Sequence, residues 1–325
     1  MSTLQPDVAD APAFDSMWVE APEWDAIAAR YDELHAAWES AADETARRQV
    51  IIDWDILRRE TATWVALAHL RFQRDTGDAA ACTARALVDT LGPRFDERNS
   101  RIQRMVLEGP HRAEIGAHFG DHVLDLWAAD ASTVSPEIQD ELVTERELQA
   151  RYTSLQGGAK IAFAGEEQTL SGMLKYRVSP DREVRHGASR AYWSWYEEQA
   201  RTFDELYDEL VTLRTSMARR LGHETFVPVA YMRKRRVDYD RHDVARYREQ
   251  IVEEVVPLAA ELRERQRKGL GLSTLHLWDE QMQADGAPPA PQGDRHELMR
   301  RAQTMFGSTL PELAELYRTM TEREL

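Results

Sequence analysis

The sequence predicts a mainly α, multi-helix fold with one small β-hairpin near residues 160–170. Two observations lead to this prediction. Apolar residues recur at steps of three and four through most of the 325 residues, which is the spacing of amphipathic helices. Polar and apolar residues alternate, as in a half-buried strand, in one short stretch near the middle of the chain.

The first half of the chain predicts a layer or bundle of helices. Helical spacing runs from Glu23 to about Gly77, and its second half predicts one long amphipathic helix with a glycine stop. One face of this helix carries Val50, Trp54, Leu57, Thr61, Trp64, Ala68 and Phe72. A further helical stretch reaches about Glu108, with a break expected at residues 92–94, Gly-Pro-Arg. Another helix is expected over 136–152, with Ser135 as its N-cap and a proline in its first turn.

The hairpin is expected in "GGAKIAFAGEEQTL", where residues 160–163 alternate and Gly165 occupies the turn. Long helices follow. One stripe consists of Phe203, Leu206, Leu210, Leu213, Met217 and Leu221, and Gly222 is expected to end it in the left-handed conformation. A second stripe consists of Val244, Tyr247, Ile251, Val255, Leu258 and Leu262, with a kink expected at Pro257. After a Pro/Gly loop at 283–294, the last helical segment runs from about Arg295 to Leu325.

The stretch "SPDREVRHGASRAYWSW", residues 179–195, combines a helix start with three arginines. Ser179 is the expected N-cap, and acidic residues in the first turn suit the helix dipole. Arg182 and Arg185 lie off the expected buried stripe. They are either solvated side chains or candidates for binding a peptide carboxylate through two hydrogen bonds each.

Charge and composition exclude several classes of partner. With 41 Lys+Arg against 57 Asp+Glu, the formal charge of −16 has the wrong sign for attracting nucleic acid or an anionic membrane. Residues 1–22 are expected to form a flexible leader without the features of a secretory signal. No stretch approaches the roughly 18 apolar residues of a membrane span. We expect a cytoplasmic protein, in which Cys82 is a buried or half-buried thiol.

No catalytic residue can be assigned from local motifs. A zinc peptidase helix carries H-E-x-x-H, but neither His223-Glu224 nor His296-Glu297 is followed by the second histidine. His118 and His122 have the i, i+4 spacing, so they are the candidates for a metal, although Phe119 stands where the catalytic glutamate belongs and Gly120 weakens the helix. Phosphate-binding glycine loops and the serine nucleophile elbow are also absent from the sequence.

The order of segments after residue 160 is more specific. "KIAFAGEEQTLSGML", "SPDREVRHGASRAYW", "MARRLGHETF" and "VVPLAAELRERQRKGLGLSTLHLWD" follow one another. This order resembles the M3 family of zinc metallopeptidases, in particular its oligoendopeptidase F branch. The matching residues are Ser179, Asp181, Arg182, Val184, Arg185, Pro257, Lys268, Leu270, Gly271, Leu272 and Asp279.

The resemblance implies a zincin-like peptidase that hydrolyses short peptides, of which this sequence matches the N-terminal half. In the family, zinc is held by an H-E-x-x-H helix and a downstream glutamate, with tyrosine and histidine groups that stabilise the oxyanion. None of these has a matching position here, so no cofactor is expected in this chain. The expected organisation is a leader at 1–22, a helical domain at 23–153, and the incomplete start of the catalytic domain at 154–325.

Three hypotheses follow. The first is the N-terminal portion of a zinc metalloendopeptidase, truncated and inactive by itself. The second is a natural pseudopeptidase that captures short peptides without cleaving them, using Arg182 or Arg185. The third is a structural half that needs a partner and self-associates through an exposed apolar face.

Overall fold

The computed structural model describes residues 16, 17, 19–283 and 292–322. The chain forms two compact units, one of Ala21–Ala284 and one of Met1–Glu20 with Asp285–Leu325. The expected leader at 1–22 and the expected Pro/Gly loop at 283–294 lie mostly outside the described residues. The expected domain boundary at 153/154 falls inside the larger unit and stays a prediction.

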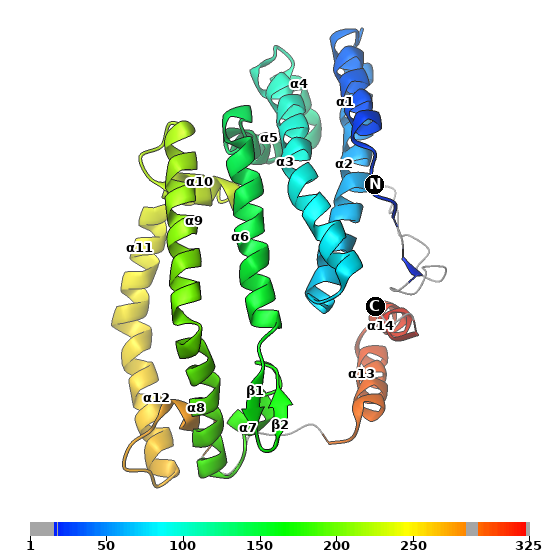
Figure 1. Cartoon of the computed structure of the whole chain (residues 1–325). Coiled ribbons are helices and arrows are strands. Elements are labelled where there is room, and N and C mark those ends of the chain that lie inside the picture. Colours follow the sequence, from blue (N-terminus) through cyan, green and yellow to red (C-terminus); the bar gives the residue numbers. More distant parts are fainter. Residues whose placement is uncertain (1–15, 18, 284–291, 323–325) are drawn as a thin grey trace. The chain divides into compact units, whose positions relative to one another are not determined.

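The mainly α fold is confirmed, and the larger unit is built around a row of long helices (Figure 1). In this row α2 (Glu44–Arg74), α3 (Ala79–Glu108), α6 (Gln139–Gly157) and α9 (Ala200–Arg220) each pack against the next. Three shorter helices pack against it: α1 (Trp24–Glu39), α4 (Arg112–Phe119) and α5 (Asp121–Ser132).

The main core lies under α2. All seven residues of the predicted stripe, from Val50 to Phe72, are buried. Asp43 caps the helix by accepting a hydrogen bond from the backbone N–H of Ala46. Ile52, Ile56 and Leu70 lie on the opposite side and are exposed, so the stripe is the face that packs and the prediction is confirmed.

The break expected at residues 92–94 is wrong, because α3 runs through Pro93 without ending. A proline inside a helix costs about 3 kcal/mol, but Gly92, Pro93 and Phe95 are all buried in the core, which offsets that cost. A Cβ at Gly92 would lie 1.6 Å from Nη1 of Arg146. The glycine therefore leaves room for this arginine of α6 to cross α3.

The predicted N-cap at Ser135 is confirmed. Its hydroxyl accepts a hydrogen bond from the N–H of Glu137, at the start of a short 3-10 helix, Pro136–Ile138, that leads into α6.

The predicted hairpin is also confirmed, as β1 (Ile161–Phe163) and β2 (Glu166–Gln168). The strands are antiparallel, with Ile161 opposite Gln168 and Phe163 opposite Glu166. The two turn residues, Ala164 and Gly165, both have positive φ, as in a type I′ turn.

The start of α8 (Arg182–Glu198) differs from the prediction. Its N-cap is Asp181, whose carboxylate accepts from the N–H groups of Glu183 and Val184. Ser179 instead accepts from the N–H of Asp181 and closes a turn before the helix, which follows the short α7 (Leu174–Arg177). The N-cap expected at Ser179 is therefore wrong by two residues.

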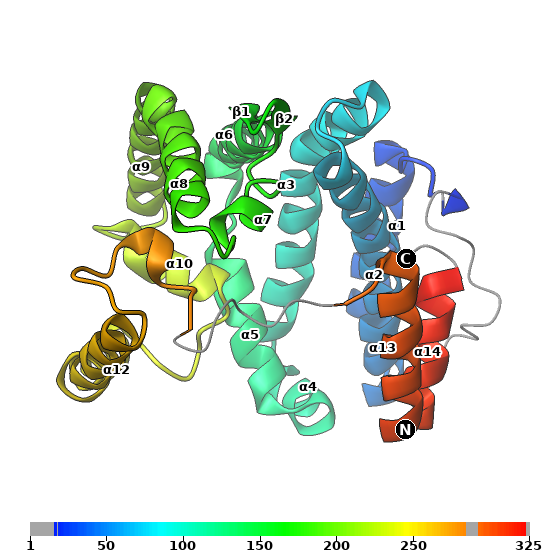
Figure 2. The same ribbon diagram turned by 90° about the horizontal axis from the view of Figure 1, so that it is seen from below.

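Helix α9 ends as predicted, with Gly222 at φ 83°. A short helix, α10 (Phe226–Arg233), leads to α11 (Arg241–Gln250), a π-helical turn (Ile251–Val255) and α12 (Val256–Gly269). In this π turn, which precedes Pro257, the N–H of Val256 bonds to the carbonyl of Ile251. The kink expected at Pro257 stays a prediction. We call residues 241–269 the arm; none of them is buried, and Figure 2 shows α12 nearly end-on, apart from α8 and α9.

The smaller unit contains a pair of helices, α13 (Arg295–Thr309) and α14 (Pro311–Glu322), which pack through Phe306 and Tyr317 with ring centroids 5.0 Å apart. The prediction of one uninterrupted last helix is wrong, because two helices separated at Leu310 are found. Leu310 is extended because it precedes a proline, whose ring disfavours the helical conformation of the residue before it. No helix of the described ranges combines the length and apolar character needed to cross a membrane.

Candidate functional site

Arg182 and Arg185 meet at one carboxylate, that of Asp279. We call these three residues the Asp279 latch. Arg182 donates from Nε (3.0 Å) and Nη2 (2.8 Å) to the two carboxylate oxygens, and Arg185 donates from Nη2 to Oδ1 at 3.0 Å. The latch joins the first turn of α8 to the short 3-10 helix Leu277–Asp279, almost one hundred residues further along the chain.

Arg185 is buried, contrary to the expectation of a solvated side chain. Its side chain is 5% exposed, whereas that of Arg182 is 39% exposed. Besides its bond to Asp279, Arg185 donates hydrogen bonds to the backbone carbonyls of Ser179, Pro180 and Trp278. The helical stripe alone places Arg185 on a polar face, but a segment distant in sequence covers that face. Peptide binding by Arg182 and Arg185 stays a prediction.

The electrostatics of the latch favour the ionised carboxylate. Burial alone would raise the pKa of Asp279, but the hydrogen bonds from Arg182, from the backbone N–H of His276 and from Arg185 outweigh it and lower the pKa from 3.8 to about 2. Asp279 is completely buried. The latch is thus a fully ionised contact at neutral pH.

An aromatic stack lies next to the Asp279 latch. The ring of Trp278 lies between His186, with centroids 4.2 Å apart, and His276, with centroids 4.4 Å apart. Its indole Nε1 is buried without a hydrogen-bond partner among the described residues. Sequence reasoning named Asp279 only as part of a motif and missed its pairing and the stack, because their members are far apart in sequence.

A second buried carboxylate, Glu145 of α6, was also missed. It accepts from Nε of Arg214 at 2.6 Å and from Nη1 of Arg233 at 2.7 Å. The ring of Phe226 lies near both guanidinium groups, at 5.6 Å and 5.3 Å. We call Glu145, Arg214, Arg233 and Phe226 the Glu145 cluster; it ties α6, α9 and α10 together.

The two histidines considered for a metal do not share a helix. His118 lies in the last turn of α4 and His122 in the first turn of α5, with Gly120 at φ 94° between them. Both are exposed, and His118 Nδ1 lies 3.1 Å from Nη1 of Arg48. The described residues contain no group of three or more His, Cys, Asp or Glu side chains that could hold a metal ion. The described residues therefore do not fit the zinc that the family resemblance implies.

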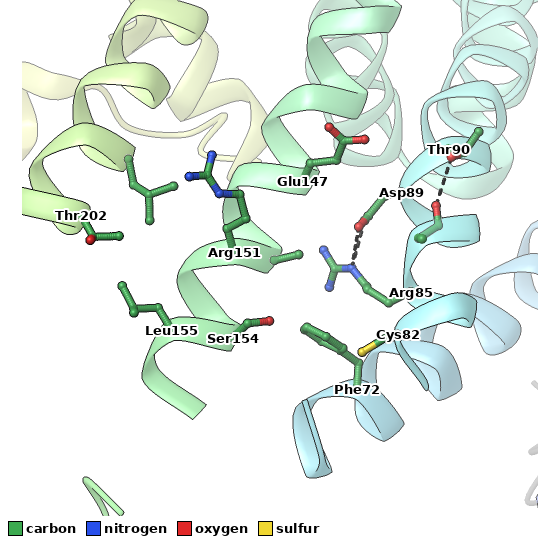
Figure 3. A pocket seen from close by; sticks show the side chains of 13 residues that line it. Phe72, Cys82, Arg85, Asp89, Thr90, Glu147, Arg151, Ser154, Leu155 and Thr202 are labelled. Atoms are coloured by element: carbon green, nitrogen blue, oxygen red, sulfur yellow. Dashed lines mark hydrogen bonds and ion pairs between the residues drawn. The ribbon is translucent and has the colours of Figure 1, made fainter. Parts of the chain in front are cut away.

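A pocket of about 640 Å³ opens between the end of α2 and helices α3, α6 and α9. Figure 3 shows the side chains that line it, with Arg85 of α3 directed toward α6. Cys82 is half-buried at its edge, as the sequence predicted, with Sγ 3.4 Å from the carbonyl of Thr76.

Comparison with known proteins defines the class. The sequence profile of the peptidase M3 N-terminal domain matches residues 14–134, and that of peptidase family M3 matches residues 175–300. The chain belongs to peptidase family M3.

Solved structures narrow the resemblance to the oligoendopeptidase F branch. A protein described as an oligoendopeptidase F from Bacillus anthracis is 30% identical, with a TM-score of 0.93 over 97% of this chain and 58% of that one. Another protein described as an oligoendopeptidase F is 34% identical, with a TM-score of 0.93 over 97% of this chain and 56% of that one. A Pz peptidase A with an inhibitor is 31% identical, with a TM-score of 0.93 over 96% of this chain and 56% of that one. No curated protein sequence matches the chain.

The chain thus spans 56–58% of the length of these three proteins.

Proposed function

We propose that the chain is the N-terminal helical portion of a zinc metalloendopeptidase of the oligoendopeptidase F type, which hydrolyses short peptides. The observation that carries this proposal is the TM-score of 0.93 at 30–34% identity, which extends over nearly the whole chain. In that role the helix row forms a rigid wall beside the substrate. The Glu145 cluster ties two helices of this row, α6 and α9, to each other and to α10, and the Asp279 latch ties α8 to the segment at 277–279.

These 325 residues by themselves are proposed not to hydrolyse peptides. The sequence has no H-E-x-x-H, and the described residues offer no ligand set for zinc. In a peptidase of this kind, zinc activates a water molecule for attack on the peptide carbonyl. The wall residues can only orient a peptide and exclude water.

The experiment is a cleavage assay on the purified chain. Internally quenched fluorogenic peptides of several lengths are incubated with the protein and added zinc, with and without a chelator, and the peptide is recovered for mass determination. We expect intact peptide in every sample. Chelator-sensitive cleavage would contradict the proposed inactivity while supporting the family function.

A peptide-binding role without cleavage is the second candidate. The pocket beside α3 and α6 favours it, because it is a concave surface on the wall that carries both apolar and charged side chains. Saturable binding of short peptides with no product distinguishes this role from a purely structural one.

Two further proposals concern organisation and location. The boundary between the helical domain and the catalytic domain is placed at 153/154, which the gap between the two matching profiles supports, since they cover 14–134 and 175–300. The cytoplasm is the proposed compartment of the chain. Expression of the chain with a fluorescent tag tests the location.

A further inference from the structure

We infer that the pocket between α3, α6 and α9 binds the C-terminal residue of a short peptide, with the free carboxylate on Arg85 and an apolar side chain on the pocket floor. The inference rests on the proposed function only for the source of the ligand, since peptide hydrolysis handles and releases chains with free carboxyl ends. The site itself follows from the side chains described below.

The cationic group is Arg85. Its side chain is only 12% exposed, and its Nε donates to both oxygens of Asp89, at 2.9 and 3.0 Å. Its two terminal nitrogens make no hydrogen bond to the described residues, and Figure 3 shows them directed away from α3 into the pocket. A desolvated guanidinium with unused N–H groups is a strong site for a carboxylate, which it can bind through two parallel hydrogen bonds.

A second donor approaches from the opposite wall. The hydroxyl of Ser154 on α6 points into the same space (Figure 3), and no side-chain hydrogen bond to the described residues occupies it. A carboxylate that accepts from Arg85 with one edge can accept from Ser154 with its other lone pairs.

The floor of the pocket is apolar. Phe72 lies beneath the guanidinium of Arg85, with its ring centroid 5.6 Å from Cζ, and Leu155 and Leu206 line the side toward α9. A ligand therefore needs an apolar group next to its carboxylate to displace water from this surface. The last residue of a peptide with a leucine-like side chain has this composition.

The charges around the pocket favour a singly charged group over phosphate. Arg85 and Arg151 are balanced by Asp89 and Glu147. Arg151 lies at the rim, 57% exposed, and faces Glu209 at 3.5 Å. Because the lining is neutral in sum, it gives an anion little net attraction, while the cost of removing the anion from water rises steeply with its charge. A doubly charged anion is therefore disfavoured relative to a carboxylate.

The test is a titration of the whole chain with N-acetyl-leucine as the probe, in which ligand-detected NMR measures the binding. Three comparison ligands are N-acetyl-leucinamide, which lacks the carboxylate, free leucine, and inorganic phosphate. We expect saturable binding of N-acetyl-leucine, with the amide at least about 10-fold weaker, the size expected for one charge-assisted pair. Tighter binding of free leucine or phosphate, or equal binding of acid and amide, would overturn the assignment.

Two variants locate the ligand. Ala86→Trp fills the pocket from an exposed position of α3 that lines it, and Ala80→Trp is the matched control on the same helix outside the pocket. Arg85→Lys keeps a positive charge beside Asp89 but removes the planar donor pair. We expect about 10-fold weaker binding in Ala86→Trp and Arg85→Lys and no change in Ala80→Trp, with folding checked by circular dichroism.

Unchanged binding in Ala86→Trp would place the ligand elsewhere and overturn the inference. Because only binding is measured, this result is independent of whether the chain cleaves peptides. A chain that binds N-acetyl-leucine without cleaving any peptide supports the inference, and a chain that cleaves peptides without binding this probe contradicts it.

Discussion

Asp279 is the residue on which the local order of the α8 region depends. Its carboxylate is completely buried and receives both Arg182 and Arg185. Removing one partner of a buried ion pair leaves the others uncompensated and costs about 3 kcal/mol. We therefore expect Asp279→Asn to lower the free energy of unfolding by about that amount in urea titrations. The matched control, Asp208→Asn on the exposed side of α9, should leave it nearly unchanged.

The ionisation of Asp279 also makes the free energy of unfolding depend on pH. The pKa of Asp279 is lowered to about 2 in the folded chain, below its ordinary value of 3.8, so the folded state favours the ionised form. Its contribution is complete above about pH 4 and is lost as the pH falls toward 2. The stability difference between the wild type and Asp279→Asn should shrink over this window in urea titrations at a series of pH values. A difference that stays constant from pH 5 to about 2 would contradict the ionised latch.

Glu145 gives a parallel prediction for the junction of α6, α9 and α10. Its side chain is 6% exposed and receives two arginines. Glu145→Gln should destabilise the protein by about 3 kcal/mol. Glu205→Gln, which breaks an exposed pair with Arg201, should cost under about 0.5 kcal/mol. Equal effects of the two substitutions in thermal unfolding would show that burial does not decide the strength of these pairs.

At the scale of elements, the sequence predicted best where one helix face alone decides the structure. The stripe from Val50 to Phe72 was predicted because α2 packs with a single face at regular spacing. The break at Pro93 was wrong because burial in the core overrides a local propensity. The pairing of Arg185 with Asp279 could not be predicted, because helical periodicity carries no information about which distant segment covers a face.

Substitutions at two glycines test two separate effects, the need for a positive φ at a helix end and the low helix propensity of glycine inside a helix. Gly222 ends α9 with φ 83°, so Gly222→Ala should lower the free energy of unfolding by about 1 kcal/mol. Gly187 lies inside α8, where an added Cβ would meet Phe163 at an ordinary 3.6 Å. Gly187→Ala should therefore raise stability by up to about 1 kcal/mol. Thermal unfolding of the two variants checks the opposite signs, and a loss of stability in both would contradict this explanation.

At the scale of the whole molecule, the arm exposes several large apolar side chains. Tyr247, Val252 and Leu258 are 62%, 63% and 54% exposed. Exposed apolar surface of this kind promotes association, so we expect light scattering to show a mass that rises with protein concentration. Val252→Glu with Leu258→Glu should suppress the rise, and a monomer at all concentrations would contradict it.

The central claim is that these 325 residues carry the helical wall of an M3 peptidase but not its metal chemistry. The most direct measurement is the zinc content of the purified chain after exhaustive dialysis against metal-free buffer. We predict far less than one zinc ion per chain. One zinc ion per chain, removed by a chelator and lost in a His118→Ala, His122→Ala variant, would contradict the claim.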